Sequence, residues 1–224
     1  MDSPLVGLVD SGVDAAIAAH LAASRAFRLA ADGQVVVAEP EPDRLGHGAA
    51  LAGLLARRVP GVRLLSAQVF LDTLSCSARQ VAAALDWLVL NEVRLVNMSF
   101  GLRRDRDVLR QACARARQAG VILVAASPAR GAPVFPASYP GVIRATGDAR
   151  CGVDEISCLA TAQADFGAHV RIEGGSVAGA SVGCAYLCGF AAAFLSRHPQ
   201  ASVEDLRAWL SERATYRGPE RRGR

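Results

Sequence analysis

Three short segments of the chain each carry one member of an aspartate, histidine and serine set. Asp10 ends an apolar run, His47 lies between two glycines before an Ala- and Leu-rich stretch, and Ser181 opens another apolar stretch. A serine hydroxyl is a weak nucleophile until an imidazole accepts its proton, and a carboxylate fixes the tautomer of that imidazole and stabilises its charge. The set therefore predicts catalysis with Ser181 as nucleophile, His47 as general base and Asp10 as the orienting carboxylate.

The elements that would position these residues can be read from the hydrophobic pattern. Strands are predicted over Leu5–Val9, Gln34–Ala38, Arg63–Val69, Leu95–Ser99, Val121–Ala126 and Val142–Thr146. Helices are predicted over Ala49–Arg58, Ala78–Asn91, Arg106–Ala119 and Ser181–Arg197, with a short last helix over Leu206–Leu210. Such alternation indicates an α/β protein with a parallel sheet covered by helices on both faces. Asp10 would then lie at the carboxyl edge of the sheet, where active sites form, and Ser181 at a helix N-terminus, where its N–H can face an oxyanion.

The sequence around the set resembles the subtilisin-like serine proteases, in which Asp, His and Ser also follow in this order. Four segments carry the resemblance: Val9-Asp10-Ser11-Gly12, His47-Gly48-Ala49-Ala50-Leu51-Ala52-Gly53, Leu95-Val96-Asn97-Met98-Ser99-Phe100-Gly101, and Phe135–Ile143. The resemblance implies a subtilisin-like three-layer α/β/α fold with a mostly parallel sheet. It also implies a serine endopeptidase with Asp10, His47 and Ser181 as its triad.

A peptide-binding cleft follows from the same resemblance. The residues implied for substrate binding are Leu74, Ser75 and Cys76 on one edge, Ser99, Phe100 and Gly101 on the other, and Ala125, Ala126 and Ser127 in the pocket wall. The two edges would hold an extended peptide by β-pairing. The mixed-charge run at 102–107 would border the cleft, either as a solvated turn or as a selector of charged substrate residues.

The chain departs from the family at two places. The serine motif lacks the family's Thr, Met and Pro and reads Gly179-Ala180-Ser181-Val182-Gly183-Cys184-Ala185. Where subtilisins have an Asn that donates to the oxyanion, alignment on Gly131 places Ala129, and a shift by one places Pro128. Neither side chain can donate, and one such donor is typically worth roughly 10²–10³ in kcat.

Length and composition narrow the choice of domain organisation and of binding partners. A chain of 224 residues that is 51% hydrophobic suits one domain, predicted over residues 1–215, and the net charge of +4 comes mainly from a basic tail, 216–224, predicted to be disordered. The sequence has no basic stripe with interleaved aromatics, so nucleic-acid binding is not expected. No apolar run approaches the roughly 20 residues that a membrane-spanning helix needs. The start lacks a signal peptide or room for a prodomain, so a cytoplasmic location is expected. The six cysteines are expected to be thiols, with no metal and no cofactor.

Three functions fit these observations. The first is an endopeptidase that makes one defined cut in a peptide or protein precursor, in company with the enzyme that modifies that precursor. In size and in its altered oxyanion segment the chain is similar to subtilisin-like maturation proteases, such as the kind that trims a leader peptide for quinohemoprotein amine dehydrogenase. The alternatives are a general intracellular degradative protease and a catalytically silent peptide-binding module.

Overall fold

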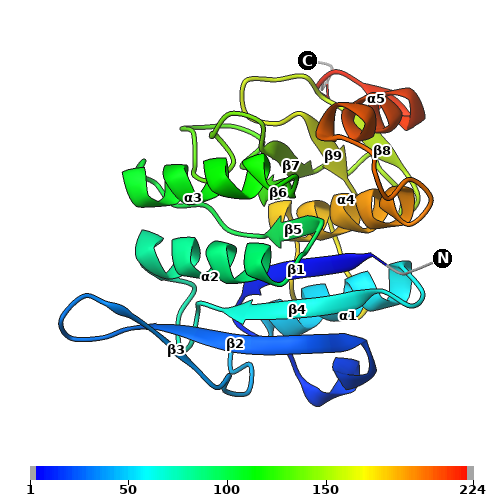
Figure 1. Ribbon diagram of the computed structural model, residues 1–224. Helices are drawn as coiled ribbons and strands as arrows, with labels where there is room; N and C mark the ends of the chain where they lie inside the picture. The colour runs from blue at the N-terminus through cyan, green and yellow to red at the C-terminus, as the bar shows by residue number, and fades with distance from the viewer. Residues whose placement is uncertain (1–3, 221–224) are drawn as a thin grey trace.

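The computed structural model describes residues 4–220, and within them ten strands form a single sheet (Figure 1). Their order across the sheet is β10-β8-β9-β7-β6-β5-β1-β4-β2-β3. The strands are β1 (Leu5–Asp10), β2 (Leu21–Leu29), β3 (Val35–Ala38), β4 (Arg63–Gln68), β5 (Leu95–Met98), β6 (Ile122–Ala126), β7 (Ile143–Gly147), β8 (Ile156–Cys158), β9 (Phe166–Ala168) and β10 (Tyr216–Arg217). The pairs β2–β3 and β8–β9 are antiparallel and the other pairs are parallel.

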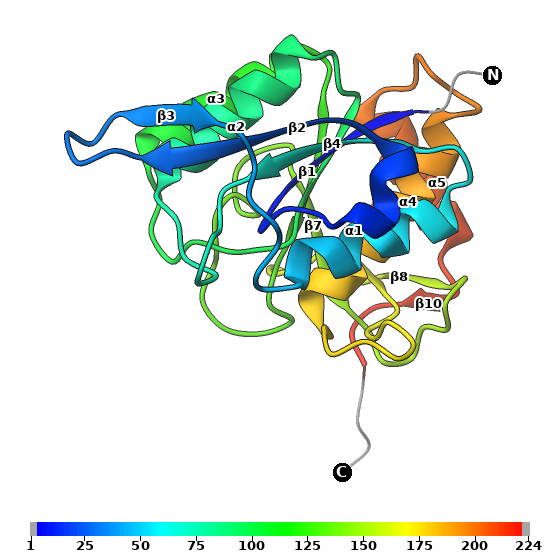
Figure 2. The ribbon, with the colours of Figure 1, turned by 90° about the horizontal axis from the view of Figure 1, so that it is seen from below.

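Helices cover both faces of this sheet, which confirms the predicted three-layer α/β/α architecture (Figure 2). The helices are the 3₁₀ helix η1 (Ala15–His20), α1 (His47–Arg58), α2 (Ala78–Leu90), α3 (Asp107–Gln118), α4 (Ala180–Leu195) and α5 (Val203–Arg213). One core lies between the sheet and α1, α4 and α5, and a second lies between the sheet and α2 and α3. Helix α4 is apolar all round and almost wholly buried, as expected of a helix at the centre of a core.

The strand register brings the carboxyl ends of the central strands together. Asp10 at the end of β1 pairs with Gln68 at the end of β4, and Val9 pairs with Met98 at the end of β5 on the other side. The residues after Val9 and Met98, Asp10 and Ser99, are therefore neighbours on adjacent strands. The candidate site lies at this edge, as the parallel-sheet prediction required.

The helix ends agree with local sequence chemistry. Ser77 and Gln80 form a capping box at the start of α2, and Ser202 and Asp205 form another at the start of α5. Each box satisfies main-chain N–H groups that a helix leaves unpaired in its first turn.

Four strands, β2, β8, β9 and β10, were not predicted from the sequence. β2 is Ala-rich and alternates irregularly between buried and exposed positions, and β8, β9 and β10 have only two or three residues each. The predicted disordered tail is wrong at its start, because Tyr216–Arg217 pair with β8 and the Gly218 N–H donates to the carbonyl of Cys158. Residues 221–224 of that tail lie outside the described residues.

Candidate active site

Asp10 and His47 form a buried pair at the carboxyl edge of the sheet. His47 Nδ1 lies 2.7 Å from Asp10 Oδ1, and the two side chains are 11% and 1% exposed. Oδ1 also accepts the main-chain N–H of Ser11 at 2.8 Å. In the neutral histidine Nδ1 carries the proton donated to Asp10, which leaves Nε2 as the basic nitrogen. The pair can thus hold an imidazole in one tautomer and one orientation.

The surroundings of His47 raise the pKa of its imidazole. Burial acts to lower the pKa of His47, but the hydrogen bond that His47 donates to Asp10, the charge of Asp10 and the charge of Asp43 together outweigh it and raise the pKa. Asp10 Oδ2 is buried and has no hydrogen-bond partner in the described part of the chain. Oδ1 accepts from His47 and from the N–H and hydroxyl of Ser11, and of these donors only the imidazole can carry a charge, so the carboxylate favours imidazolium formation during proton transfer.

His47 is the first residue of α1, and four hydrogen bonds from main-chain N–H groups fix the start of that helix. The Asp43 carboxylate accepts the N–H groups of Leu45, Gly46 and Ala49 at 2.8–3.0 Å. The Gly48 N–H donates to Ser11 Oγ at 2.8 Å, which ties the first turn to the end of β1. A Cβ on Gly48 would overlap the carbonyl oxygen of Gly12, so glycine is required for this close approach.

Ser181 is the second residue of α4, where its N–H has no partner within the helix. Its hydroxyl donates to the main-chain carbonyl of Ser99 at 2.9 Å. Since Ser99 lies beside Asp10 across the strands, Ser181 lies close to the Asp10–His47 pair. Among the described residues no hydrogen bond joins Ser181 to His47. The structure thus brings Asp10 and His47 into contact and places Ser181 nearby with its hydroxyl turned to Ser99.

The residues predicted for substrate binding follow the ends of neighbouring strands. Ser99 is buried and Phe100 packs edge-on against Phe70, the ring centroids lying 5.4 Å apart. Leu74 is 58% exposed, and Ser75 and Cys76 follow it in the segment after β4. Because β4 and β5 flank β1, the segments 74–76 and 99–101 emerge on either side of the strand that ends in Asp10.

In the predicted pocket wall, the side chains of Ala125, Ala126 and Ser127 are all buried. The side chain of Ala125 packs into the core beneath α2 and α3, so that this residue offers only its main chain to a ligand. Ala129 and Arg130 line a cavity of about 380 Å³ together with Thr146 and Gly147 at the end of β7. No side-chain amide donor stands at 128 or 129 in this loop.

The cysteines are thiols, as expected: all six are free. Burial, with a contribution from the charge of Asp10, raises the pKa of Cys76 to about 12. This thiol therefore stays protonated near neutral pH and is no rival nucleophile. Within residues 4–220 no cluster of His, Cys, Asp and Glu side chains is arranged to hold a metal ion. No helix in the same range is both long and apolar enough to cross a bilayer.

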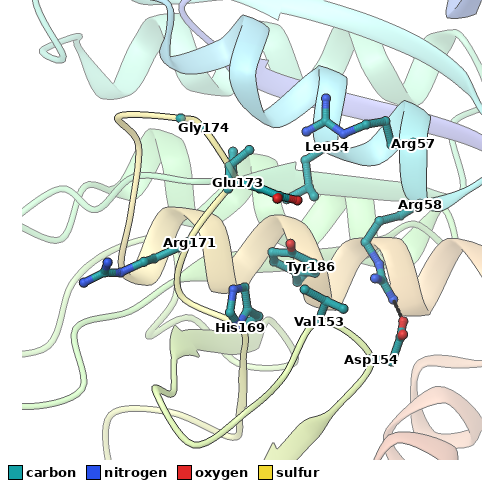
Figure 3. A pocket seen from close by; sticks show the side chains of 12 residues that line it. Leu54, Arg57, Arg58, Val153, Asp154, His169, Arg171, Glu173, Gly174 and Tyr186 are labelled. Atoms are coloured by element: carbon teal, nitrogen blue, oxygen red, sulfur yellow. Dashed lines mark hydrogen bonds and ion pairs between the residues drawn. The ribbon is translucent and has the colours of Figure 1, made fainter.

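A cavity of about 1180 Å³ opens elsewhere, between the last turns of α1, Tyr186 on α4 and the segments at 153–154 and 169–175 (Figure 3). Arg58 lines one side of it, pairing with Asp154 at 2.9 Å and lying over the ring of Tyr186. His169 also lines it and is held through Nδ1 by the Cys151 carbonyl at 2.8 Å. Neither Asp10, His47 nor Ser181 lines this cavity, and its mixed charges favour no one ligand.

Sequence reasoning missed two supporting groups. Asp43 was not singled out from the sequence, although an Asp shortly before a helix start is a recognised capping pattern. Cys184 was treated only as a small buried thiol, whereas its Sγ lies 3.4 Å from Asn97 Oδ1. Nothing in a single sequence indicates a contact between residues so far apart in the chain.

Comparison with known proteins agrees with this geometry. A sequence model of the subtilase family matches residues 2–223. The chain is 27% identical to the thermostable alkaline protease of Halalkalibacterium halodurans over 232 residues, covering 92% of this chain and 62% of that protein. It is 25% identical to subtilisin DY of Bacillus licheniformis over 238 residues, covering 95% of this chain and 84% of that protein. It spans only 18% of a third relative, the minor extracellular protease Epr of Bacillus subtilis.

Solved structures show the same fold. The S41 psychrophilic protease superposes with a TM-score of 0.72 at 17% identity, over 96% of this chain and 85% of that one. A cold adapted subtilisin-like serine proteinase superposes with a TM-score of 0.70 at 19% identity, over 94% and 84% of the two chains.

Proposed function

The chain belongs to the subtilase family of serine endopeptidases, and from that premise we propose that Asp10, His47 and Ser181 form its catalytic triad. The observation that carries the proposal is the buried 2.7 Å contact between His47 Nδ1 and Asp10 Oδ1. It leaves Nε2 of His47 free to accept a proton, which is the role of a general base. Ser181 supplies the only part of the triad that must move.

In the proposed reaction, Ser181 turns its hydroxyl from the Ser99 carbonyl to His47 and attacks the scissile carbonyl carbon. His47 takes the proton and later delivers it to the leaving amine, while Asp10 stabilises the imidazolium. The negative oxygen of the tetrahedral intermediate is stabilised by the N–H of Ser181, which the helix leaves unpaired, and by the dipole of α4. Water then hydrolyses the acyl-enzyme by the same proton transfers in reverse.

We propose further that the substrate is a peptide or protein precursor, cut at one position to remove a leader. The missing side-chain donor at 128 and 129 supports this, because a lower turnover is tolerable in an enzyme that cuts each substrate once. The six free thiols support action in a reducing compartment such as the cytoplasm. We expect the precursor to be presented with its modifying enzyme.

The triad is tested by labelling with a fluorophosphonate probe, which reacts with activated serines. Peptide mapping should find the label on Ser181, and labelling should be lost in Ser181→Ala and His47→Ala. Ser196→Ala is the matched control: Ser196 lies just beyond the other end of α4 and bonds only locally, to the Ala193 carbonyl. Wild-type labelling of Ser181→Ala would refute the assignment.

The precursor role is tested by comparing substrates. Incubation with casein, an unfolded-protein mixture and candidate leader-bearing precursors should yield one defined cut in one precursor and slow cleavage elsewhere. Comparable rates on unrelated unfolded proteins would contradict the role and favour general degradation.

A further inference from the structure

Two reciprocal hydrogen bonds join the start of α4 to the end of β5. Ser181 Oγ donates to the Ser99 carbonyl at 2.9 Å, and Ser99 Oγ donates to the Ser181 carbonyl at 3.0 Å. Both residues thus use their hydroxyl on the other's main chain. The position of the Ser181 main chain relative to the sheet is set by this pair of bonds.

Behind the pair lies a second layer of polar groups. Asn97 Nδ2 donates to Ser99 Oγ at 3.0 Å, and the thiol of Cys184 donates to Asn97 Oδ1 at 3.4 Å. Asn97 and Cys184 are both 0% exposed. Asn97 lies on β5, and its side chain meets Cys184 of α4, the helix that packs on this part of the sheet. Polar groups buried so deeply are almost always hydrogen-bonded, because leaving one without a partner lowers the stability of the fold.

The Cys184 thiol lies 3.4 Å from Asn97 Oδ1 and 3.9 Å from the Met98 carbonyl, and the shorter contact makes Asn97 its acceptor. With that donor assigned, the rest of the chain of bonds runs in one direction. A thiol has one hydrogen, so that with Cys184 as donor the group facing it must be the amide oxygen of Asn97. The amide nitrogen of Asn97 then faces Ser99 and donates to its hydroxyl oxygen. The single hydrogen of that hydroxyl is left for the Ser181 carbonyl. The orientation of Asn97 therefore decides which way the Ser99 hydroxyl points.

We propose that Asn97, oriented by Cys184, is a positioning residue for Ser181. It acts through Ser99 and touches no substrate, and the inference rests on the proposed role of Ser181 as nucleophile. Its effect is to hold the first turn of α4, and with it the hydroxyl and N–H of Ser181, in register with the Asp10–His47 pair. Misplacement of a reacting group by about 1 Å can cost roughly 10²-fold in rate.

The test removes the thiol and keeps the fold. Cys184→Ala deletes the donor, Cys184→Ser restores a donor, and Cys113→Ala is the matched control. Cys113 is an equally buried thiol on α3 in the other core. For each folded variant the rate constant for labelling of Ser181 by a small fluorophosphonate is measured, with kcat and KM on a cleaved peptide.

Cys184→Ala should slow labelling and kcat by roughly tenfold with KM unchanged, part of the loss that a 1 Å misplacement would cause. Cys184→Ser should recover most of the rate, and Cys113→Ala should keep it. Equal labelling rates for Cys184→Ala and Cys113→Ala would overturn the proposal, because a thiol that only fills space would give that result.

A second measurement separates this inference from the assignment of the nucleophile. Hydrogen exchange of the peptide covering residues 178–186 should become faster in Cys184→Ala and in Asn97→Ala, and stay unchanged in Cys113→Ala. If wild-type Ser181 does not react with the probe, the proposed function fails, but the exchange result still decides whether Asn97 and Cys184 hold this turn. Unchanged exchange in Cys184→Ala would overturn the positioning role.

Discussion

Gly48 offers the sharpest test of how the candidate site is assembled. A Cβ placed there would overlap the carbonyl oxygen of Gly12 and would lie 3.0 Å from Gly12 N and 3.2 Å from Asp10 Cβ. These atoms belong to the main chain of Gly12 and to the Cβ of Asp10, which side-chain rotation cannot move away. To regain contact distances of roughly 3.5 Å, the first turn of α1 must move by about 1 Å from β1. Gly48→Ala should therefore separate His47 from Asp10.

The size of the effect follows from that displacement. Overpacking of this kind costs about 1–3 kcal/mol, and about 2–4 °C of Tm per kcal/mol is typical at this chain length. Gly48→Ala should lower Tm by about 2–12 °C. A 1 Å shift of a catalytic group should lower kcat by roughly 100-fold, with a smaller effect on KM.

Gly53→Ala on the same helix is the matched control. Its Cβ would meet only the mobile end of the Arg57 side chain, at 3.4 Å. Replacing a helical glycine by alanine there should be neutral or stabilising by up to about 1 kcal/mol. Thermal unfolding followed by circular dichroism, and kcat on a cleaved peptide, measure both effects. If Gly48→Ala matched Gly53→Ala in Tm and kcat, the close approach of α1 to β1 would not be needed.

Three more predictions concern the same edge of the sheet. Asp10→Asn removes both contributions of Asp10 that raise the pKa of His47. Since His47 must be neutral to act as base, the acid limb of the plot of kcat/KM against pH should move to lower pH. The value of kcat should fall by roughly 10⁴. A limb that stays in place would refute the coupling. Gly183→Ala puts a Cβ into the main chain at the end of β7 and should lower Tm and kcat, whereas Gly189→Ala, with only side-chain neighbours, should not. Ala129→Asn should raise kcat about tenfold by adding an oxyanion donor, and an unchanged kcat in the folded variant would show that another group serves there.

The sequence was sufficient to predict the elements that build the site. The strand ending in Asp10 was expected within one residue of its observed bounds, and the helix that begins near Ser181 within one residue at its start and two at its end. Those elements have strong apolar patterns; Gly12 follows the strand and Gly179 precedes the helix. Interactions between residues close in the chain determine such elements, so they can be predicted from a single sequence.

Features that depend on distant contacts were not predictable in this way. β2 forms because Leu21–Leu29 lies between β4 and β3, although its alanines have little preference for strands. β10 forms because β8 offers an unpaired edge to Tyr216–Arg217. The bond from Cys184 to Asn97 likewise exists only after the helix has packed on the sheet. Tertiary context decides each of these.

The distance along the chain between Ser99 and Ser181 affects when catalysis can start. The two residues that exchange hydroxyl hydrogen bonds are 82 positions apart. At about 5–20 residues per second of synthesis, roughly 4–16 s pass between the emergence of one and of the other. With Ser181 as the nucleophile, a growing chain that has already made Asp10, His47 and β5 still has no reactive hydroxyl. The enzyme therefore cannot cut nascent chains around it, or itself, until α4 has been synthesised and has packed on the sheet.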